Sequence, residues 1–225
     1  MTLAAPLELP AALAAAGVSL RPVAEGDFPF LRHLYRSLRW DELAPTLWPD
    51  EAKVAFLDQQ FAFQHRHYTS GFAAAEFYLV ERQAEPIGRF YIDRETRHWY
   101  LMEISLLPDW RGRGLGAALV GLLQDEVRAG RGDRVSLNVE TTNPARRLYA
   151  RLGFVEVAAP DEFPRLSLEM MWSARPSTGA LGWRATCASA TWANRLWPTQ
   201  ASGSSPKRLR ANAISAAASS STRSS

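Results

Sequence analysis

The chain has 225 residues, an apolar fraction of 47% and one cysteine, Cys187. These values suit a single globular domain with appendages and exclude an internal disulfide framework or a zinc site built on cysteine pairs. The formal charge of +3 is uneven, because residues 173–225 hold seven basic and no acidic residues, leaving 19 basic against 23 acidic residues in 1–172. This mildly acidic body does not suggest a nucleic-acid-binding surface.

The two ends of the chain differ from its body. Residues 1–16 are rich in alanine, but no Lys or Arg precedes their apolar stretch and Glu8 interrupts it. We therefore predict no signal peptide and a cytoplasmic protein. No run reaches the roughly 18–20 apolar residues of a membrane span. Residues 173–225 keep no apolar period, so we predict a disordered basic tail, with contact between that tail and nucleic acid as the alternative.

The first half of the body alternates between strand and helix patterns. A short strand at 18–22 is followed by a helix at 25–38 and, after a loop, a second helix at 50–68 with Asp50 as its N-cap. Two strand-like runs, 74–83 and 87–96, are separated by a short turn. Their spacing predicts an antiparallel hairpin.

The second half reads as strand, helix, strand, helix and two final strands. The predicted ranges are a strand at 98–108, a helix of about 15 residues ending near Gly130, a strand at 135–140, a helix at 143–153, and strands at 154–159 and 164–172. Antiparallel strands followed by strand–helix–strand units predict an α/β (α+β) fold. We expect a mixed, mostly antiparallel sheet with helices on both faces.

A glycine-rich turn after the strand 98–108 is the most informative segment. It reads Arg111-Gly112-Arg113-Gly114-Leu115-Gly116-Ala117. The start of a helix leaves backbone N–H groups unpaired and carries partial positive charge, and glycines let a ligand approach the backbone closely. The turn therefore suits a pyrophosphate, and the two arginines add charge. A turn that only lets the helix pack tightly on the strand is the structural alternative.

Two other nucleotide motifs compete for this turn. No Gly-Lys-Ser/Thr occurs in the chain, which excludes a Walker-type loop. Residues 112–117 satisfy the dinucleotide pattern G-x-G-x-x-A, and Glu140 ends the next strand, where a ribose-binding acid would lie. Against this reading, residues 108–111 separate the glycines from the strand. The segment also follows a hairpin and does not open a parallel sheet.

The helix at 143–153 carries clear signals at both ends. Asn143 is a suitable N-cap, and Pro144 stands at the first helical position. Gly153 supplies the C-terminal stop, and Phe154 opens the next strand.

Together these two segments resemble the GNAT superfamily of N-acetyltransferases. The family's pyrophosphate loop, R/Q-x-x-G-x-G/A, is matched by Arg111, Gly114 and Gly116. Its cofactor helix, N-x-x-A/R-x-x-L-Y-x-x-x-G-F, is matched from Asn143 to Phe154. The resemblance predicts an N-terminal extension at 1–16, an N-acetyltransferase domain at 17–172, and the tail.

The resemblance implies transfer of acetyl from acetyl-coenzyme A to a primary amine by direct attack in a ternary complex, without a metal. It places a splayed parallel strand pair at 101–107 and 135–140, with the pantetheine arm in the gap. A backbone N–H near Leu106 would polarise the acetyl carbonyl. The residues implied for cofactor binding are Leu106, Arg111, Gly112, Arg113, Gly114, Leu115, Gly116, Ala117 and Asn143.

Two residues are candidates for catalysis. Tyr149 resembles the family's general acid, and the pKa of an ordinary tyrosine, about 10, keeps the phenol protonated near neutral pH. Packing against the cofactor is its alternative role. Glu103 is the only ionisable residue in its strand segment and a candidate general base; a salt-bridged glutamate, Tyr100 or ordered water are the alternatives. Regular alternation places Glu103 on the face of Leu101 and Ser105.

The acceptor is expected at the loop between the first two helices. Its acidic and aromatic residues are Trp40, Asp41, Glu42, Trp48 and Asp50. Such a loop suits a cationic amine of a small molecule or peptide, with packed tryptophans in a solvated loop as the alternative. We expect no membrane partner and no metal, since His65 and His67 diverge on their helix. The oligomeric state stays open, a homodimer included.

Two further functions are compatible with the sequence. One is a non-catalytic module that senses acyl-coenzyme A, against which the presence of Tyr149 and a strand carboxylate argues. The other is an NAD-binding oxidoreductase, which rests on Glu140 and residues 112–117.

Overall fold

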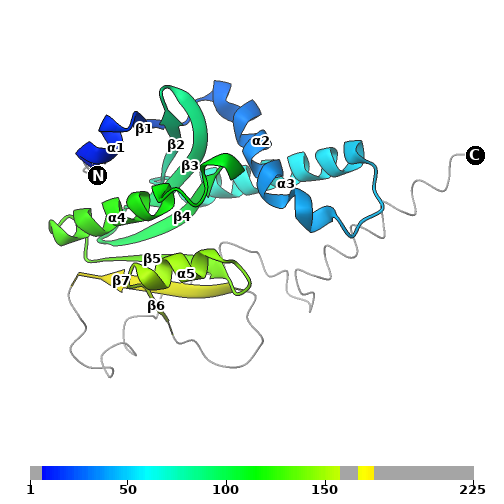
Figure 1. Ribbon diagram of the computed structural model, residues 1–225. Helices are drawn as coiled ribbons and strands as arrows, with labels where there is room; N and C mark the ends of the chain where they lie inside the picture. Colours follow the sequence, from blue (N-terminus) through cyan, green and yellow to red (C-terminus); the bar gives the residue numbers. More distant parts are fainter. Residues whose placement is uncertain (1–6, 158–166, 175–225) are drawn as a thin grey trace, which may run out of the picture. The chain divides into compact units, whose positions relative to one another are not determined.

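The computed structural model describes residues 7–157 and 167–174 (Figure 1). The predicted disordered tail starts too early at 173, because Ser173 is the last residue of β7; the rest of it from residue 175 onward, Cys187 included, lies outside these ranges. The helices are α1 (Ala11–Ala15), α2 (Phe28–Arg39), α3 (Asp50–Gly71), α4 (Leu115–Arg128) and α5 (Ala145–Arg151), with 3-10 turns η1 (Glu25–Asp27), η2 (Trp40–Leu43) and η3 (Pro108–Trp110). The strands are β1 (Val18–Pro22), β2 (Glu76–Arg82), β3 (Glu85–Asp93), β4 (His98–Leu106), β5 (Arg134–Glu140), β6 (Val155–Glu156) and β7 (Ser167–Ser173).

Each helix and strand predicted from the sequence is present in the described residues, with differences at the ends. The helix predicted from residue 25 opens with the turn η1, and α3 continues to Gly71. The predicted N-cap of α3 is wrong, because Pro49 with extended backbone takes that place and Asp50 is already helical. In the first turn Asp50 still opposes the positive end of the helix dipole.

The segment before β1 forms a helix that the sequence did not indicate. Residues 1–16 were expected to lie outside the domain, yet Leu7, Leu9 and Leu13 pack against the main apolar cluster. The N-cap of α1 is Pro10 without a side-chain hydrogen bond, so packing of Leu13, and of Leu7 and Leu9 just before the helix, supports α1.

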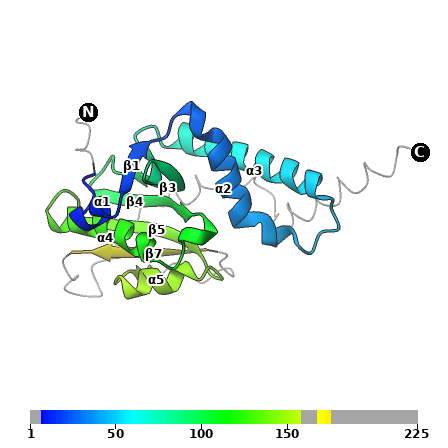
Figure 2. The same cartoon turned by 45° about the horizontal axis from the view of Figure 1, so that its top comes forward.

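The strands form one seven-stranded sheet in the order β1-β2-β3-β4-β5-β7-β6. Neighbouring strands are antiparallel except for the pair β4 and β5, which is parallel. The predicted mixed, mostly antiparallel sheet is confirmed. In both views β5 and β7 lie side by side, and α2 packs along α3 (Figures 1 and 2).

Helices cover both faces of the sheet, as predicted. The larger apolar cluster packs α4 and α5 against the strands through residues such as Leu119, Leu123 and Leu137. The smaller one packs α2 and α3 against β2. Leu79 and Val80 are neighbours on β2 but belong to different clusters, because successive strand side chains point to opposite faces.

The parallel strands β4 and β5 pair only at their beginnings. Four residue pairs join them, from His98 with Arg134 to Leu101 with Leu137. Beyond that point β4 stays with β3 as far as Leu106, while β5 stays with β7 as far as Glu140. The two strands separate toward their C-terminal ends, which confirms the predicted splayed pair.

A β-bulge in β4 lies where the two strands begin to separate. The pairing with β3 passes from Leu101 directly to Glu103, so Met102 is left out of the register. An extra residue reverses which side chains face which side of a strand. Leu101 accordingly packs in the α4 cluster, whereas Glu103 is hydrogen-bonded to Tyr68 of α3. The predicted common face of Leu101 and Glu103 is wrong, because it assumed regular alternation.

Gly88 allows β3 to lie close against the end of β4. It pairs with Leu106, and a Cβ added at Gly88 would lie 2.4 Å from the carbonyl oxygen of Ser105 and 2.6 Å from Cδ2 of Leu106. Since one of these contacts is backbone, a side chain here would displace the end of β4 and with it Leu106.

We expect Gly88→Ala to lower the free energy of unfolding by about 1–3 kcal/mol, the usual cost of overpacking. Urea unfolding followed by circular dichroism measures the change. Gly121→Ala on α4 is the control, since its added Cβ meets no atom within 4 Å and alanine favours a helix by about 0.5–1 kcal/mol. Two variants of equal stability would contradict the close contact of β3 and β4.

Candidate functional site

The turn between β4 and α4 has the geometry of an anion site at a helix N-terminus. Gly112 and Gly114 both adopt left-handed backbone, with φ of 69° and 82°, and α4 begins directly after Gly114. The first intrahelical bond runs from the N–H of Ala118 to the carbonyl of Gly114. The N–H groups of residues 115–117 therefore point out of the helix, toward the exposed glycines.

The glycines of this turn face open space. A Cβ added at Gly112 or Gly114 would meet no atom within 4 Å, and one at Gly116 would make an ordinary 3.7 Å contact with Leu148. Tight packing of the helix on the strand therefore does not explain them. Positive φ at two positions and free space before the helix are what a bound anion requires.

One arginine of the turn is bonded to the backbone of β4, and two others lie near the ring of Trp110. Arg111 folds back, and its Nε donates to the carbonyl of Leu106 at 2.9 Å, which braces the turn against the end of β4. The guanidinium of Arg113 lies 5.1 Å from the ring centre of Trp110, and that of Arg82 lies 5.0 Å from it. Arg82 comes from β2, so no local motif around residues 111–117 could have indicated it.

The backbone of Leu106 is directed into the gap between β4 and β5. The next residue, Leu107, donates its N–H to Ile87 of β3 at 2.9 Å. Because backbone groups of a strand alternate in direction, the N–H of Leu106 points the other way, to the side where β5 has separated. This is the orientation that the predicted carbonyl-polarising N–H requires.

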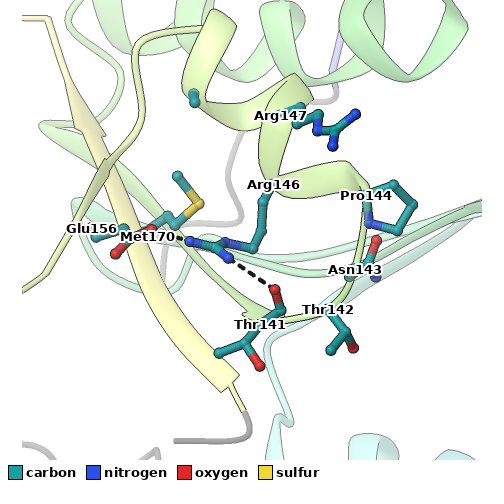
Figure 3. Close-up of a pocket in the computed structure, with 9 residues that line it drawn as sticks. Thr141, Thr142, Asn143, Pro144, Arg146, Arg147, Glu156 and Met170 are labelled. Carbon is teal, nitrogen blue, oxygen red and sulfur yellow. Dashed lines mark hydrogen bonds and ion pairs between the residues drawn. The ribbon is translucent and has the colours of Figure 1, made fainter.

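Asn143 lies at the start of α5 and at the edge of a pocket of about 480 Å³ (Figure 3). The helix starts at Ala145 with Pro144 as its N-cap, so the predicted N-cap at Asn143 is wrong by one residue. The Oδ1 atom of Asn143 still accepts the N–H of Ala145 at 2.9 Å. Arg146 extends from α5 into the same region and donates to the carbonyl of Thr141 at 2.8 Å (Figure 3). The bond from Ala145 occupies the side-chain oxygen of Asn143 and leaves its NH₂ group as a donor for a ligand.

Tyr149 is buried on α5. Its ring centre lies 5.9 Å from that of Phe154, and Gln124 holds the end of the helix by donating to the carbonyl of Leu152 at 2.7 Å. Burial, and then the charge of Glu103, raises the pKa of Tyr149 to about 12. The phenol therefore stays protonated near neutral pH and keeps a proton to donate.

Glu103 lies in a polar cluster between the sheet and α3. Its Oε2 accepts the hydroxyl of Tyr68 at 3.3 Å and lies 3.4 Å from Nη2 of Arg89, while its Oε1 accepts the hydroxyl of Ser105. The side chain of Arg89 is only 2% exposed and also donates to Gln64 at 3.0 Å. The carboxylate thus has partners on both oxygens.

This environment decides the charge of Glu103. Burial would raise its pKa, but the charge of Arg89, the hydrogen bond from Ser105 and smaller contributions from Arg39 and Tyr68 together lower it. Glu103 stays ionised at neutral pH and is a weak base. The sequence signal for Arg89 is an arginine inside an otherwise apolar strand, since a buried guanidinium requires a carboxylate.

The loop between α2 and α3 is less open than the sequence suggested. Lys53 lies 5.6 Å over the ring of Trp40 and 3.5 Å from Asp50, and Arg39 pairs with Glu42 at 2.9 Å. The remaining tryptophan, Trp48, packs on Phe56 at 5.4 Å, while Asp41 is exposed. Packed rings and internal ion pairs account for most of this loop.

Glu140, the acidic residue that would bind the ribose of NAD, already has a partner within the chain. Glu140 lies 3.7 Å from Arg39.

In residues 7–157 and 167–174 no three His, Cys, Asp or Glu side chains gather as metal ligands would. Over the same ranges, no helix combines the length and the apolar character needed to cross a membrane.

Comparison with known proteins agrees with this geometry. Residues 34–154, more than half of the chain, match the model of the acetyltransferase (GNAT) family. The chain belongs to the GNAT family. A GNAT acetyltransferase is an acyltransferase, and the mostly antiparallel sheet excludes the dinucleotide-binding oxidoreductase. A search of curated protein sequences gave no match.

Solved GNAT structures share the fold of this chain. PaiA N-acetyltransferase from Thermoplasma acidophilum, in complex with coenzyme A, is 14% identical with a TM-score of 0.52, over 69% of this chain and 98% of that one. RimL, a ribosomal L7/L12 α-N-protein acetyltransferase in complex with coenzyme A, is 16% identical with a TM-score of 0.50, over 75% and 96%. An acetyltransferase from Streptococcus agalactiae is 18% identical with a TM-score of 0.50, over 70% and 98%.

We expect Gly114→Val to abolish binding of coenzyme A, because a β-branched residue cannot keep φ near 82° and the N–H groups at the start of α4 would turn away. Thermal unfolding with and without coenzyme A measures the loss. At 100 times the dissociation constant the ligand should stabilise the unchanged protein by about 2.7 kcal/mol.

The matched control is Gly130→Val, at the other end of α4. Gly130 also has φ of 82° and open space around its Cβ position, so both variants carry the same backbone strain. Only the Gly114 variant should lose the coenzyme A shift. A Gly114 variant that is stabilised as strongly as the control would refute the assignment of this turn.

Proposed function

We propose that this chain transfers the acetyl group of acetyl-coenzyme A to a primary amine of a small molecule or peptide, by direct attack in a ternary complex. The observation that carries the proposal is the separation of β4 from β5 beyond Leu101. The anion-binding turn lies after β4, and the Leu106 N–H is directed into the gap. Tyr149 packs on the α4 and α5 face of the sheet, and Glu103 lies on the α3 face.

The residues present fit acetyl-coenzyme A as the donor. We assign the pyrophosphate to the N–H groups of residues 112–117, with Arg113 and Arg82 nearby, and the pantetheine to the gap and to Asn143. Arg111 takes part by bracing the turn, since its side chain is already bonded to Leu106. The coenzyme A present in the PaiA and RimL structures supports this donor. A donor of this kind suits the cytoplasmic location expected from the sequence.

The chemistry follows from the groups around the gap. The Leu106 N–H polarises the thioester carbonyl and stabilises the oxyanion that forms on attack. Tyr149 donates its proton to the sulfur as the carbon–sulfur bond breaks. Glu103, ionised and held by Arg89, faces the acceptor side and stabilises a protonated amine. We take residues 17–172, together with α1, as the catalytic unit.

The amine acceptor is tested with a panel of primary amines. Spermidine, lysine, benzylamine, kanamycin and a peptide with a free N-terminus are each incubated with acetyl-coenzyme A, and acetylated product is detected by mass spectrometry. Amide product above the uncatalysed level with at least one amine supports the proposal. Binding of acetyl-coenzyme A without product from any of these amines would favour the sensing module.

We expect Tyr149→Phe to lower kcat by about 10²-fold or more, because the leaving thiolate loses its proton donor. The dissociation constant of coenzyme A, measured by titration calorimetry, should change little, since the ring and its packing on Phe154 remain. Phe154→Leu is the control, as it alters the packing of the ring while keeping the phenol. An unchanged kcat in the Tyr149 variant would remove this residue as the acid.

A further inference from the structure

A second carboxylate, Glu169 of β7, faces the same side of the sheet as Glu103. Glu169 is paired with Asn138 of β5, and directly paired residues of neighbouring strands point to the same face. Asn138 shares a hydrogen bond with the hydroxyl of Tyr100 on β4, and burial, together with the charges of Glu169 and Glu103, raises the pKa of that hydroxyl. The two glutamates therefore lie on either side of the point where β4 and β5 separate.

The surroundings of these two carboxylates differ. Both oxygens of Glu103 accept hydrogen bonds, and Arg89 compensates its charge. Glu169 is half-buried, yet among residues 7–157 and 167–174 no hydrogen bond or salt bridge reaches its carboxylate. A half-buried carboxylate that accepts no hydrogen bond from these residues, and whose charge Arg134 offsets only in part, can bind a proton or a cation on this face of the sheet.

The charged and titratable groups on the face of Glu169 come from two strands and one helix. β4 contributes His98, Tyr100 and Glu103, β5 contributes Arg134 and Glu140, and α2 places Arg39 3.7 Å from Glu140. Glu156 of β6 lies on the opposite face, where it pairs with Arg146. Burial raises the pKa of Glu169, and the charge of Arg134 opposes this only in part.

The neighbours of Glu169 are poor proton acceptors by comparison. Burial raises the pKa of Tyr100, which keeps its phenol protonated. Burial lowers the pKa of His98 to about 4, and its Nε2 atom is engaged with Ser136 at 2.8 Å. A base works best when its pKa lies close to the operating pH, and two carboxylates in contrasting environments commonly divide the work between them.

We propose that Glu169 is the catalytic residue that takes the proton from the acceptor amine, while Glu103 remains ionised and holds the ammonium group in place. This inference rests on the amine acetyltransferase function proposed above. It assigns to β7 the base that the sequence placed on β4.

The acceptor nitrogen loses two protons during the transfer. The ammonium gives one proton to Glu169, which later releases it to solvent, and the free amine attacks the thioester carbon. A carbon–nitrogen bond forms and the carbon–sulfur bond breaks. The nitrogen loses its second proton to solvent, the sulfur takes the proton of Tyr149, and solvent returns one proton to the phenolate. The products are the amide and coenzyme A thiol.

The test compares two acceptors that differ in their need for a base. The first is the best primary alkylamine of the panel, which is protonated near neutral pH. The second is its alkoxyamine analogue, in which oxygen replaces the carbon next to nitrogen, so that the nucleophile is already neutral. Steady-state rates of Glu169→Gln, Glu103→Gln and the unchanged protein are measured with both, across pH. Glu85→Gln, an exposed glutamate at the start of β3, is the matched control.

We expect Glu169→Gln to lower kcat with the alkylamine by about 10²-fold or more, and to lower it far less with the alkoxyamine. The deficit should shrink as pH rises and the free amine accumulates. Glu103→Gln should mainly raise the KM of the alkylamine, and Glu85→Gln should change neither parameter.

Two results would overturn the assignment. Equal losses with both acceptors would show that Glu169 has a structural role only, and an unaffected kcat would show that it takes no part. If the unchanged protein acetylates no amine although it binds coenzyme A, the proposed function itself fails. That failure is visible before any variant is measured.

Discussion

The single extra residue at Met102 is the constraint on which the site depends. It lies where β4 stops pairing with β5, and it turns the following side chains of β4 to the opposite face. Without it, Glu103 would point into the apolar cluster under α4, and the strand would have no local reason to bend away from β5. One inserted residue thus accompanies both the gap in which we propose that the donor binds and a charged group on the proposed acceptor face.

The charge that the bulge exposes is fixed by a buried partner. Removing a guanidinium from water costs several kcal/mol, and Arg89 is almost fully buried. Its compensation comes from Glu103, from Gln64 and from the ring of Tyr91, whose centre lies 5.3 Å away. Such an arrangement is weak evidence for stability, because an apolar pair of the same volume would hold the fold as well. Its consequence is a carboxylate that stays ionised and in place.

The sequence predicts the features of this fold that neighbouring residues determine, and it misses those that depend on contacts between distant segments. The glycine turn at 111–117 and the helix with Asn143 and Tyr149 are encoded by neighbouring residues, so their patterns predicted them correctly. The bulge at Met102 arises from pairing with β3, and regular alternation cannot show it. Tyr68 and Arg89, two partners of Glu103, lie on α3 and β3, and the leucines that support α1 pack on a core formed by distant strands and helices. These features appear only when the strands are brought together.

The difference between local signals and long-range contacts also applies to the two substrates: the sequence indicates the proposed donor site but not the acceptor. The donor side is built from one continuous stretch with local signals, and the family model accordingly matches residues 34–154. The face where we propose that the acceptor binds carries Tyr68 from α3, Tyr100 and Glu103 from β4, and Glu169 from β7, none of which belongs to a motif. A GNAT domain can therefore keep its donor site while single substitutions on these separate elements change the amine it receives. The residues on the proposed acceptor face form no sequence motif. The kind of amine that they bind therefore has to be inferred from the charge and burial of each side chain.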